Sequence, residues 1–252
     1  MKSTTPIITL LFSLLLFAGC RAPLELLETG ELERADISTE VLVDMVPDYS
    51  DRLQTLSGSG RAFISQPGNS DRVSIDFHSN REASLVTFRN RLGMEGGQLL
   101  VEEDSVLVYN RIDKVAEKIA LKDANLTEVG TLATINLVEL FHYPIQRSEI
   151  TDIYQDDQYY VAITEDRTRI TIDKNSGFIM DLQTHPDTDA PYSRISYESY
   201  ESLGDFYLPK KITIFSQDGA IRVTMLVRQI QANQELPELK IQVPDEVPII
   251  SI

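Results

Sequence analysis

The chain has 252 residues, with 39 acidic and 23 basic side chains, and a formal net charge of −16 at pH 7. A chain this acidic is repelled by phosphate backbones, which argues against nucleic acid as a partner. The chain has a single cysteine, Cys20, which excludes an intramolecular disulfide. If this thiol is acylated, a Cys-bound zinc site is excluded as well.

The amino-terminal residues 1–19 have the layout of a secretory signal peptide: a charged start at Lys2, an apolar run from Ile7 to Phe17, and small residues before Cys20. The run is too short to span a bilayer, which takes about 20 apolar residues. Ala18-Gly19-Cys20 resembles the bacterial lipobox, in which the cysteine is acylated. The sequence therefore predicts a lipid-anchored Cys20. An ordinary secretory peptide with a chance cysteine is the alternative.

Residues 20–36 are acidic and contain few β-branched side chains, so they are predicted to be an acylated amino terminus and a tether. A single domain is predicted to follow over residues 37–252. It begins with a helix capped by Ser38 or Thr39, whose apolar residues recur at spacings of three and four. Pro47 either kinks this helix or starts a second short one through Tyr49, Leu53 and Leu56.

From Gly58 the hydrophobic period changes to two, which predicts antiparallel strands with one buried face. Turn signals separate the strands at residues 66–69, 103–104, 174–177 and 217–219. A helix at about 131–143, with Thr131 as a possible cap and Pro144 after it, interrupts them. The pattern predicts a mainly β fold of about eleven strands, six before this helix and about five after it.

A sheet of about eleven strands is expected to coil, and two amphipathic helices would lie across its concave side. Such an antiparallel half-barrel covered by lid helices can leave an apolar cavity. The same inward-facing residues could equally form a filled core. The candidate cavity-lining residues are Ile75, Phe77, Val106, Val108, Val161, Ile163, Ile172, Val223 and Met225.

Three segments resemble the LolA/LolB-like group of proteins that localise lipoproteins, and a related family of envelope lipoproteins. They are Arg91–Glu95 with the hairpin 98–109, the segment 208–214, and the carboxyl-terminal segment 236–245. The resemblance implies an eleven-stranded half-barrel with lid helices and an apolar cavity for acyl chains. It also implies that Leu92, Gly93 and Met94 form a loop contacting membrane or cargo.

No other group of residues in the sequence indicates a metal site or a catalytic site. His78, His142 and His185 are isolated in sequence and favour no metal site, and Asp173–Gly177 fits a hairpin turn better than a calcium loop. No convergent acid, base or nucleophile appears, so neither an enzyme nor a cofactor is predicted. An aromatic set could line a lipid or sugar mouth, or could simply follow strand propensity: Tyr192, Tyr197, Tyr200, Phe206 and Tyr207.

These observations together predict an outer-membrane-anchored protein that accommodates acyl chains of lipid or lipoprotein cargo in lipoprotein localisation. It would be a monomer that faces the periplasm, with exposure at the cell surface as a second arrangement. The alternative is an envelope interaction or sensor module with a filled core, which binds a protein partner through an exposed face or sheet edge.

Overall fold

A computed structural model describes residues 32–120, 135–188 and 190–251. Residues Leu32–Ile252 form one compact unit, and every contact discussed below lies within it. The predicted signal peptide, Cys20 and most of the predicted tether lie outside the described residues. No helix in the described ranges has the length and apolar character needed to cross a membrane.

The unit is built on one sheet of fifteen strands, with the order β1-β8-β9-β10-β11-β12-β13-β14-β2-β3-β4-β5-β6-β7-β15. All neighbours pair antiparallel except β15 and β7, which are parallel. The strands are β1 (Glu33–Arg34), β2 (Thr55–Gln66), β3 (Asn69–Asn80), β4 (Ser84–Arg89), β5 (Glu95–Val101), β6 (Ser105–Asn110), β7 (Val115–Ala120), β8 (Ile150–Gln155), β9 (Tyr159–Thr164), β10 (Arg169–Asp173), β11 (Ile179–Gln183), β12 (Tyr192–Leu203), β13 (Phe206–Ser216), β14 (Arg222–Ala232) and β15 (Ile249–Ser251).

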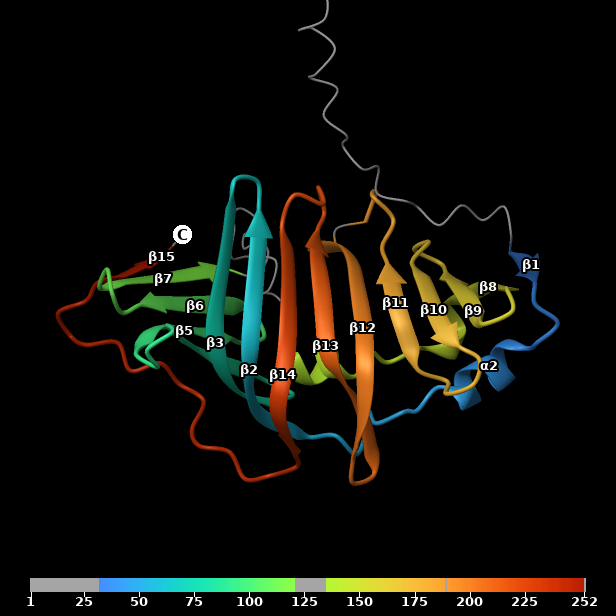
Figure 1. Cartoon of the computed structure of the whole chain (residues 1–252), viewed down its shortest axis with the longest axis horizontal. Helices are drawn as coiled ribbons and strands as arrows, with labels where there is room; N and C mark the ends of the chain where they lie inside the picture. Colours follow the sequence, from blue (N-terminus) through green and yellow to red (C-terminus); the bar gives the residue numbers. More distant parts are fainter. Residues whose placement is uncertain (1–31, 121–134, 189, 252) are drawn as a thin grey trace, which may run out of the picture. The chain divides into compact units, whose positions relative to one another are not determined.

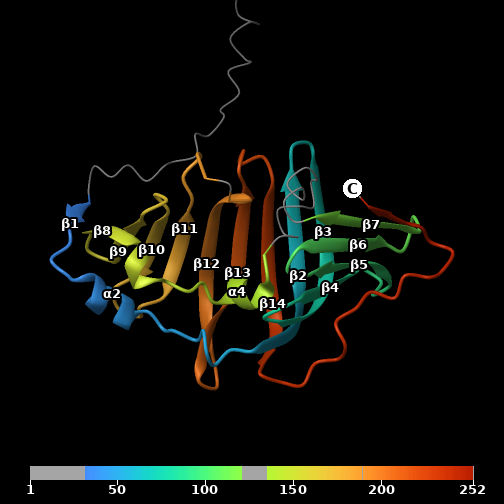
Figure 2. The same cartoon turned by 180° about the vertical axis from the view of Figure 1, so that it is seen from behind.

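The sheet twists strongly along this order. In Figure 1, β5, β6 and β7 run crosswise to β2 and β3, and β8 to β10 turn away from the central strands at the other end. Figure 2 shows α4 (Leu137–Phe141) in front of the central strands, so this helix lies on one face of the sheet. Large antiparallel sheets coil in this way because every strand adds right-handed twist.

The predicted hairpins are confirmed. Turns at 67–68, 102–104, 174–178 and 217–221 each join a pair of antiparallel neighbours, at positions that the turn signals mark. Gly68, Gly177 and Gly219 have φ of 78°, 72° and 68°, the left-handed conformation that these turns require. Between α2 and α4 the described residues form six strands, β2 to β7, as predicted.

The number of strands after α4 differs from the prediction. Seven strands, β8 to β14, follow the helix before the short β15, and β1 adds a further edge strand. β1 lies inside the predicted tether, where Glu33 and Arg34 pair with Gln155 and Tyr154. Strands of two or three residues contain too few positions to show alternation, so the sequence pattern does not reveal β1 or β15.

The first predicted helix is confirmed as α2 (Thr39–Met45), with Ser38 as its cap. The second short helix after Pro47 is not formed. Residues 50–52 make a turn instead, in which Asp48 accepts a hydrogen bond from the Ser50 N–H (2.8 Å). Tyr49, Leu53 and Leu56 are nevertheless buried, so their spacing reports burial rather than a helix.

The middle helix is shorter than predicted. α4 covers Leu137–Phe141, and its cap is Asn136 rather than Thr131, which lies outside the described residues. The Asn136 side chain accepts the Val138 N–H (2.8 Å) and donates to the Asn80 carbonyl (2.8 Å). A short 3₁₀ helix, η4 (Arg147–Glu149), leads into β8.

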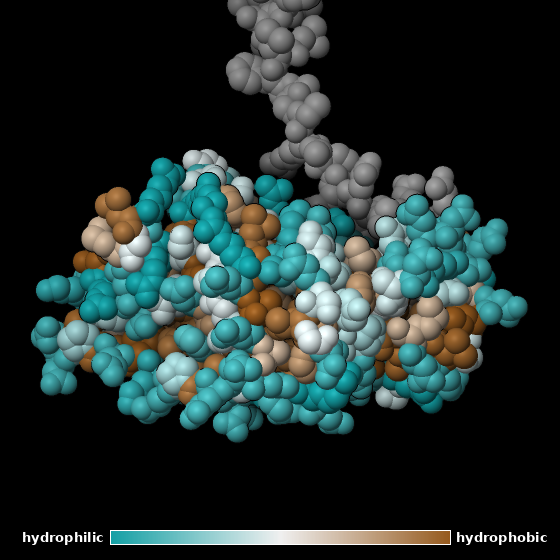
Figure 3. Space-filling view, turned by 60° about the horizontal axis from the view of Figure 1, so that its bottom comes forward, coloured by the Kyte–Doolittle hydropathy of each residue, from teal (hydrophilic) through white to brown (hydrophobic). Residues whose placement is uncertain are grey.

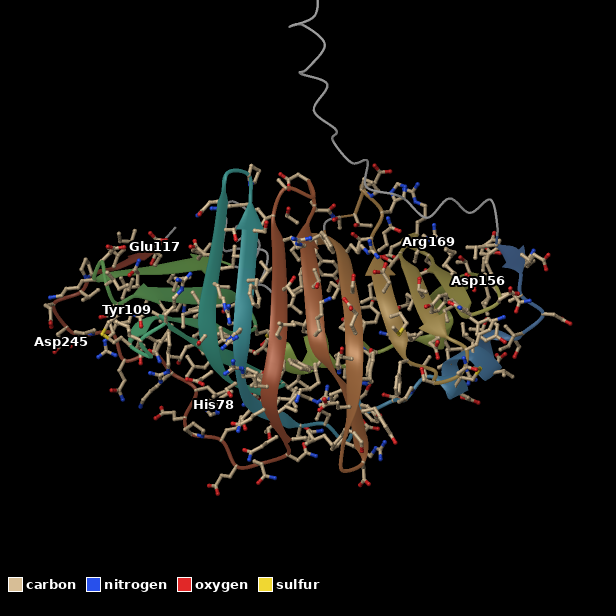
Figure 4. The ribbon with its side chains drawn as sticks, in the orientation of Figure 1. His78, Tyr109, Glu117, Asp156, Arg169 and Asp245 are labelled. Atoms are coloured by element: carbon tan, nitrogen blue, oxygen red, sulfur yellow. The ribbon has the colours of Figure 1, made fainter. Side chains whose placement is uncertain are left out.

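The main hydrophobic core lies on the face of the sheet that α4 covers. It includes the fully buried Phe77, whose ring stacks on Phe141 of α4 with centroids 5.8 Å apart. A second, smaller cluster joins Tyr109 and Ala116 to Val247 of the carboxyl-terminal segment. Figure 4 shows Tyr109 close to this segment, which carries Asp245.

Candidate functional site

A small pocket lies where the ends of α2 and α4 meet the strands β11, β12 and β13. Its volume is about 30 Å³, close to the space that one water molecule occupies. The walls are almost entirely apolar or aromatic: Val46, Pro47, Tyr49, Phe141, His142, Tyr143, Phe178, Ile179, Tyr197, Tyr200 and Tyr207. We refer to it as the aromatic pocket.

Stacked rings build the wall formed by the strands. Phe178 stacks on Tyr200 with centroids 4.4 Å apart and lies 5.4 Å from the Tyr207 ring. The Tyr200 hydroxyl donates to the Ile179 carbonyl at 2.6 Å. Ser199 has a φ of 59°, which interrupts the strand alternation, so Tyr197 and Tyr200 both reach the pocket.

Tyr197 is the unusual wall residue of this pocket. The side chain is only 2% exposed, and its hydroxyl has no hydrogen-bond partner among the described residues. Burial raises the pKa of Tyr197 well above its ordinary value, so the group is a neutral O–H donor at physiological pH. A buried hydroxyl without a partner costs about 1–3 kcal/mol, which a ligand acceptor or a water would recover.

The opposite wall is held by His142, at the end of α4. Its Nε2 accepts the Tyr49 N–H at 3.0 Å and lies 3.3 Å from an Asp48 carboxylate oxygen. Burial lowers the pKa of His142, and the Asp48 carboxylate partly offsets this effect. A neutral imidazole with Nε2 as the acceptor therefore ties the segment after α2 to α4.

Seven of the nine predicted cavity-lining residues lie in the protein interior, and none of the nine lines this pocket. Ile75, Phe77, Val106, Ile172 and Met225 belong to the main core, and Val108 packs against it. Val223 is buried two residues before Met225 on the same strand. Their role as cavity walls stays a prediction.

β9 presents a different face to the core from the one that its sequence indicates. Ala162 is in the core and pairs with Ile170, whereas Val161 pairs with Thr171 and Ile163 with Arg169. Val161 and Ile163 therefore point to the opposite side of the sheet. Both faces of β9 carry apolar side chains, so alternation alone does not identify the inner one.

The predicted contact loop forms a tight turn between β4 and β5. The Asn90 side chain accepts the N–H groups of Leu92 (2.9 Å) and Met94 (3.1 Å), while Gly93 has a φ of 79°. This turn leaves the Leu92 side chain 82% exposed and that of Met94 57% exposed. The role of Leu92, Gly93 and Met94 in membrane contact stays a prediction.

The sequence singled out three of the five tyrosines of the pocket but not its other walls. Tyr197, Tyr200 and Tyr207 belong to the predicted aromatic set. Tyr49, His142 and Phe178 come from three separate segments, and no local pattern links them. Within the described ranges, no group of three His, Cys, Asp or Glu side chains could hold a metal ion.

No protein-family model matches the chain, and no curated protein matches it by sequence. Solved structures do match. A domain assigned to outer membrane lipoprotein sorting from Vibrio parahaemolyticus has a TM-score of 0.52 at 12% identity, over 79% of this chain and 92% of that one. A LolA superfamily protein from Nitrosomonas europaea has a TM-score of 0.50 at 13% identity, over 80% and 96% of the two chains. The chain has a LolA-like fold.

A DUF1329 family protein from Desulfovibrio piger shares the LolA-like fold, with a TM-score of 0.55 at 13% identity over 79% of this chain and 93% of that one. The resemblance based on Arg91–Glu95 and the two later segments is thus confirmed at the level of fold. The sheet is larger than the eleven strands that the resemblance implied.

Proposed function

We propose that this protein is a non-enzymatic lipid- or lipoprotein-binding protein, anchored to the outer membrane through acylated Cys20. The curved sheet would act as a half-barrel with α2 and α4 as lids. The acyl chain of a lipid or of lipoprotein cargo would bind on the face of the sheet that α4 covers. The observation that supports this most directly is the aromatic pocket, because its walls are apolar and one wall residue, Tyr197, has a buried hydroxyl without a partner among the described residues.

The chemistry of the pocket suits the ester or carboxyl end of an acyl chain. The Tyr197 hydroxyl would donate to the carbonyl oxygen, and the rings of Phe178, Tyr200 and Tyr207 would pack on the first methylenes. A C16 chain removes about fifteen CH₂ groups from water, at about 0.8 kcal/mol each, before ordering costs are subtracted. Burial of this size gives tight binding without ionic contacts.

The pocket in this structure is too small for such a chain, so binding requires α4 to move. α4 is a helix of five residues, held to β3 and β4 by polar contacts through Asn136 and Ser84 and by the burial of four apolar side chains. Moving it off the sheet would open the main core beside Phe77 and Ile75, two of the predicted cavity walls. The aromatic pocket would then be the closed end of the acyl site.

The test compares Tyr197→Phe with the wild type in displacement of a fluorescent fatty acid. Loss of one hydrogen bond predicts affinity about five- to tenfold weaker, at about 1–1.5 kcal/mol. Stability should be unchanged or higher, because the variant removes a buried hydroxyl that has no partner. Tyr109→Phe, in the smaller cluster on the other face, is the matched control and should bind as the wild type does. Unaltered binding by Tyr197→Phe, or no displaceable lipid in any form, would contradict the proposal.

A second candidate function is an envelope interaction or sensor module with a filled core. The small volume of the aromatic pocket, about 30 Å³, favours it. A single stoichiometric protein partner in cross-linking from the native envelope, together with no lipid in native mass spectrometry, would support this function over the first.

A further inference from the structure

Four arginines gather on the outer face of the central strands, away from the core. Arg61 lies on β2, Arg72 on β3 and Arg228 on β14, while Arg91 follows β4. Arg61, Arg72 and Arg91 line a hollow of about 410 Å³, together with Val73 and Ser74. Alternation places Arg61 opposite the core, because its neighbour Ala62 is a core residue. We call this hollow the arginine site.

The positive charge of the arginine site is not compensated within the described residues. None of the four guanidinium groups has a carboxylate at ion-pair distance there, and Asp76 and Glu95 on neighbouring strands are engaged with other arginines. Asp76 accepts from Arg89 at 2.7 Å, and Glu95 from Arg111 at 2.9 Å. Desolvation, together with repulsion from Arg228 and Arg72, lowers the pKa of Arg61. In a chain of net charge −16, such a cluster indicates an anionic ligand.

The geometry of the site suits phosphate groups. Arg61 is half-buried on a central strand, and the Arg72 guanidinium lies over the Phe63 ring, 5.2 Å from its centroid. Arg61 is thus partly enclosed by its neighbours on the sheet, while the exposed Arg72 rests on an aromatic ring. The guanidinium fork binds phosphate oxygens in a bidentate manner, which an ammonium group does not reproduce.

The apolar side chains beside the arginine site indicate that the phosphate belongs to a membrane surface rather than to a soluble molecule. Arg91 is followed by the exposed Leu92 and Met94, and Ile112 is exposed on the β6–β7 turn. Figure 3 shows hydrophobic residues reaching the surface only in patches among hydrophilic ones on the face seen there. A soluble phosphate makes no use of exposed apolar side chains. A phospholipid surface binds both kinds of side chain, because apolar side chains enter the headgroup layer while arginines bind the phosphates.

We propose that Arg61, Arg72 and Arg91 bind the phosphate groups of anionic phospholipids, while Leu92 and Met94 enter the headgroup layer beside them. The arginine site lies on the opposite face of the sheet from the aromatic pocket. It is independent of acyl-chain binding and would remain if that function failed.

The test uses the compact unit 32–252, which has its own core and contains no acyl anchor. Its co-sedimentation with vesicles is measured for pure phosphatidylcholine and for mixtures with one third phosphatidylglycerol. The patch variant is Arg61→Gln/Arg72→Gln/Arg91→Gln. The matched control is Arg34→Gln/Arg147→Gln/Arg167→Gln. It changes the net charge by the same amount, at exposed ion pairs outside the arginine site.

The wild type and the control should prefer the anionic vesicles, and the patch variant should bind them at least tenfold more weakly. Pyrophosphate, as a soluble phosphate source, should displace the wild type from the vesicles. Leu92→Ser should weaken vesicle binding without changing pyrophosphate binding, and Tyr197→Phe should change neither. Equal binding by the patch variant and the control overturns the proposal. So does pyrophosphate binding without vesicle binding, which would assign the site to a soluble anion.

Discussion

At the scale of single residues, this fold depends on close backbone approach and on a few buried polar groups. β2 contains Gly58 and Gly60 where it is sandwiched between β14 and β3. A Cβ at Gly58 would lie 2.3 Å from the Gln229 carbonyl oxygen and 2.6 Å from the Phe77 ring. The glycines of the segment 57–60 are therefore required by the packing of a central strand.

Gly58→Ala should lower the free energy of unfolding by about 1–3 kcal/mol, because the carbonyl of a neighbouring strand and a fully buried ring must both shift. Urea unfolding followed by circular dichroism measures the change. Gly96→Ala is the control, since a Cβ there meets nothing closer than 3.6 Å, and we expect a change within about 0.5 kcal/mol. Equal losses in the two variants would contradict this account of β2.

His142 predicts a pH dependence of stability. Burial lowers its pKa in the folded protein below the ordinary value of 6.5, and Arg81 opposes protonation further, while Asp48 favours it. Well above pH 6.5 the imidazole is neutral in both the folded and the unfolded state, so its titration does not change the free energy of unfolding. As the pH falls through 6.5, the unfolded state takes up a proton that the folded state resists, so stability is lost on acidification.

Carboxylates elsewhere also titrate in this range, so the measured quantity is the difference between the wild type and His142→Gln. We expect the advantage of the wild type in unfolding free energy to shrink between pH 7.5 and pH 5.5. A difference that stays constant, or that grows toward low pH, would show that His142 does not titrate as described.

At the scale of elements, α4 depends on a small polar network more than on its own length. A helix of five residues has little intrinsic stability, so its contacts with the sheet hold it. The Ser84 hydroxyl accepts the Leu137 N–H at 2.9 Å and lies 2.7 Å from the Ser79 hydroxyl. With the Asn136 cap, these groups join the first turn of α4 to β3 and β4.

Asn136→Ala should therefore cost about 1–3 kcal/mol, because it removes the cap of α4 and leaves the Asn80 carbonyl with one partner fewer. Ser38→Ala, at the exposed cap of α2, is the comparison and should cost less, at about 0.5–1 kcal/mol. Thermal unfolding of both variants tests the order. If acyl binding requires α4 to move, Asn136→Ala should also speed fatty-acid exchange, whereas Ser38→Ala should not.

At the scale of the whole molecule, the predicted anchor and the arginine site would make separate contributions to membrane association. Acylation of Cys20 would hold the chain at the membrane irrespective of charge, because two or more acyl chains anchor stably. The arginine site would act through electrostatics, which salt screens.

Cys20→Ser, expressed in a bacterium that processes lipoproteins, should move the protein from the membrane fraction to the salt-soluble fraction. The wild type should resist a wash in about 1 M salt, where the Debye length is about 3 Å. Retention of Cys20→Ser in the membrane after this wash would contradict lipidation as the anchor. Mass spectrometry of the amino-terminal peptide identifies the acyl chains directly.

Elements with a local cause could be predicted from the sequence alone. Period-two alternation and the turn residues predict the hairpins, the spacing after Ser38 predicts α2, and the motif at Arg91–Glu95 indicates the fold group. Each of these depends on residues close in the chain, whose backbone preferences and burial pattern act without help from distant segments.

Features that join distant segments depend on the folded arrangement and could not be predicted from local patterns. The aromatic pocket takes walls from Val46 to Tyr207, the arginine site takes side chains from β2, β3 and the turn after β4, and the inner face of β9 is fixed by pairing with Ile170. β1 and β15 exist because longer neighbours offer them a free edge. Long-range pairing and packing select these arrangements, and no local preference encodes them.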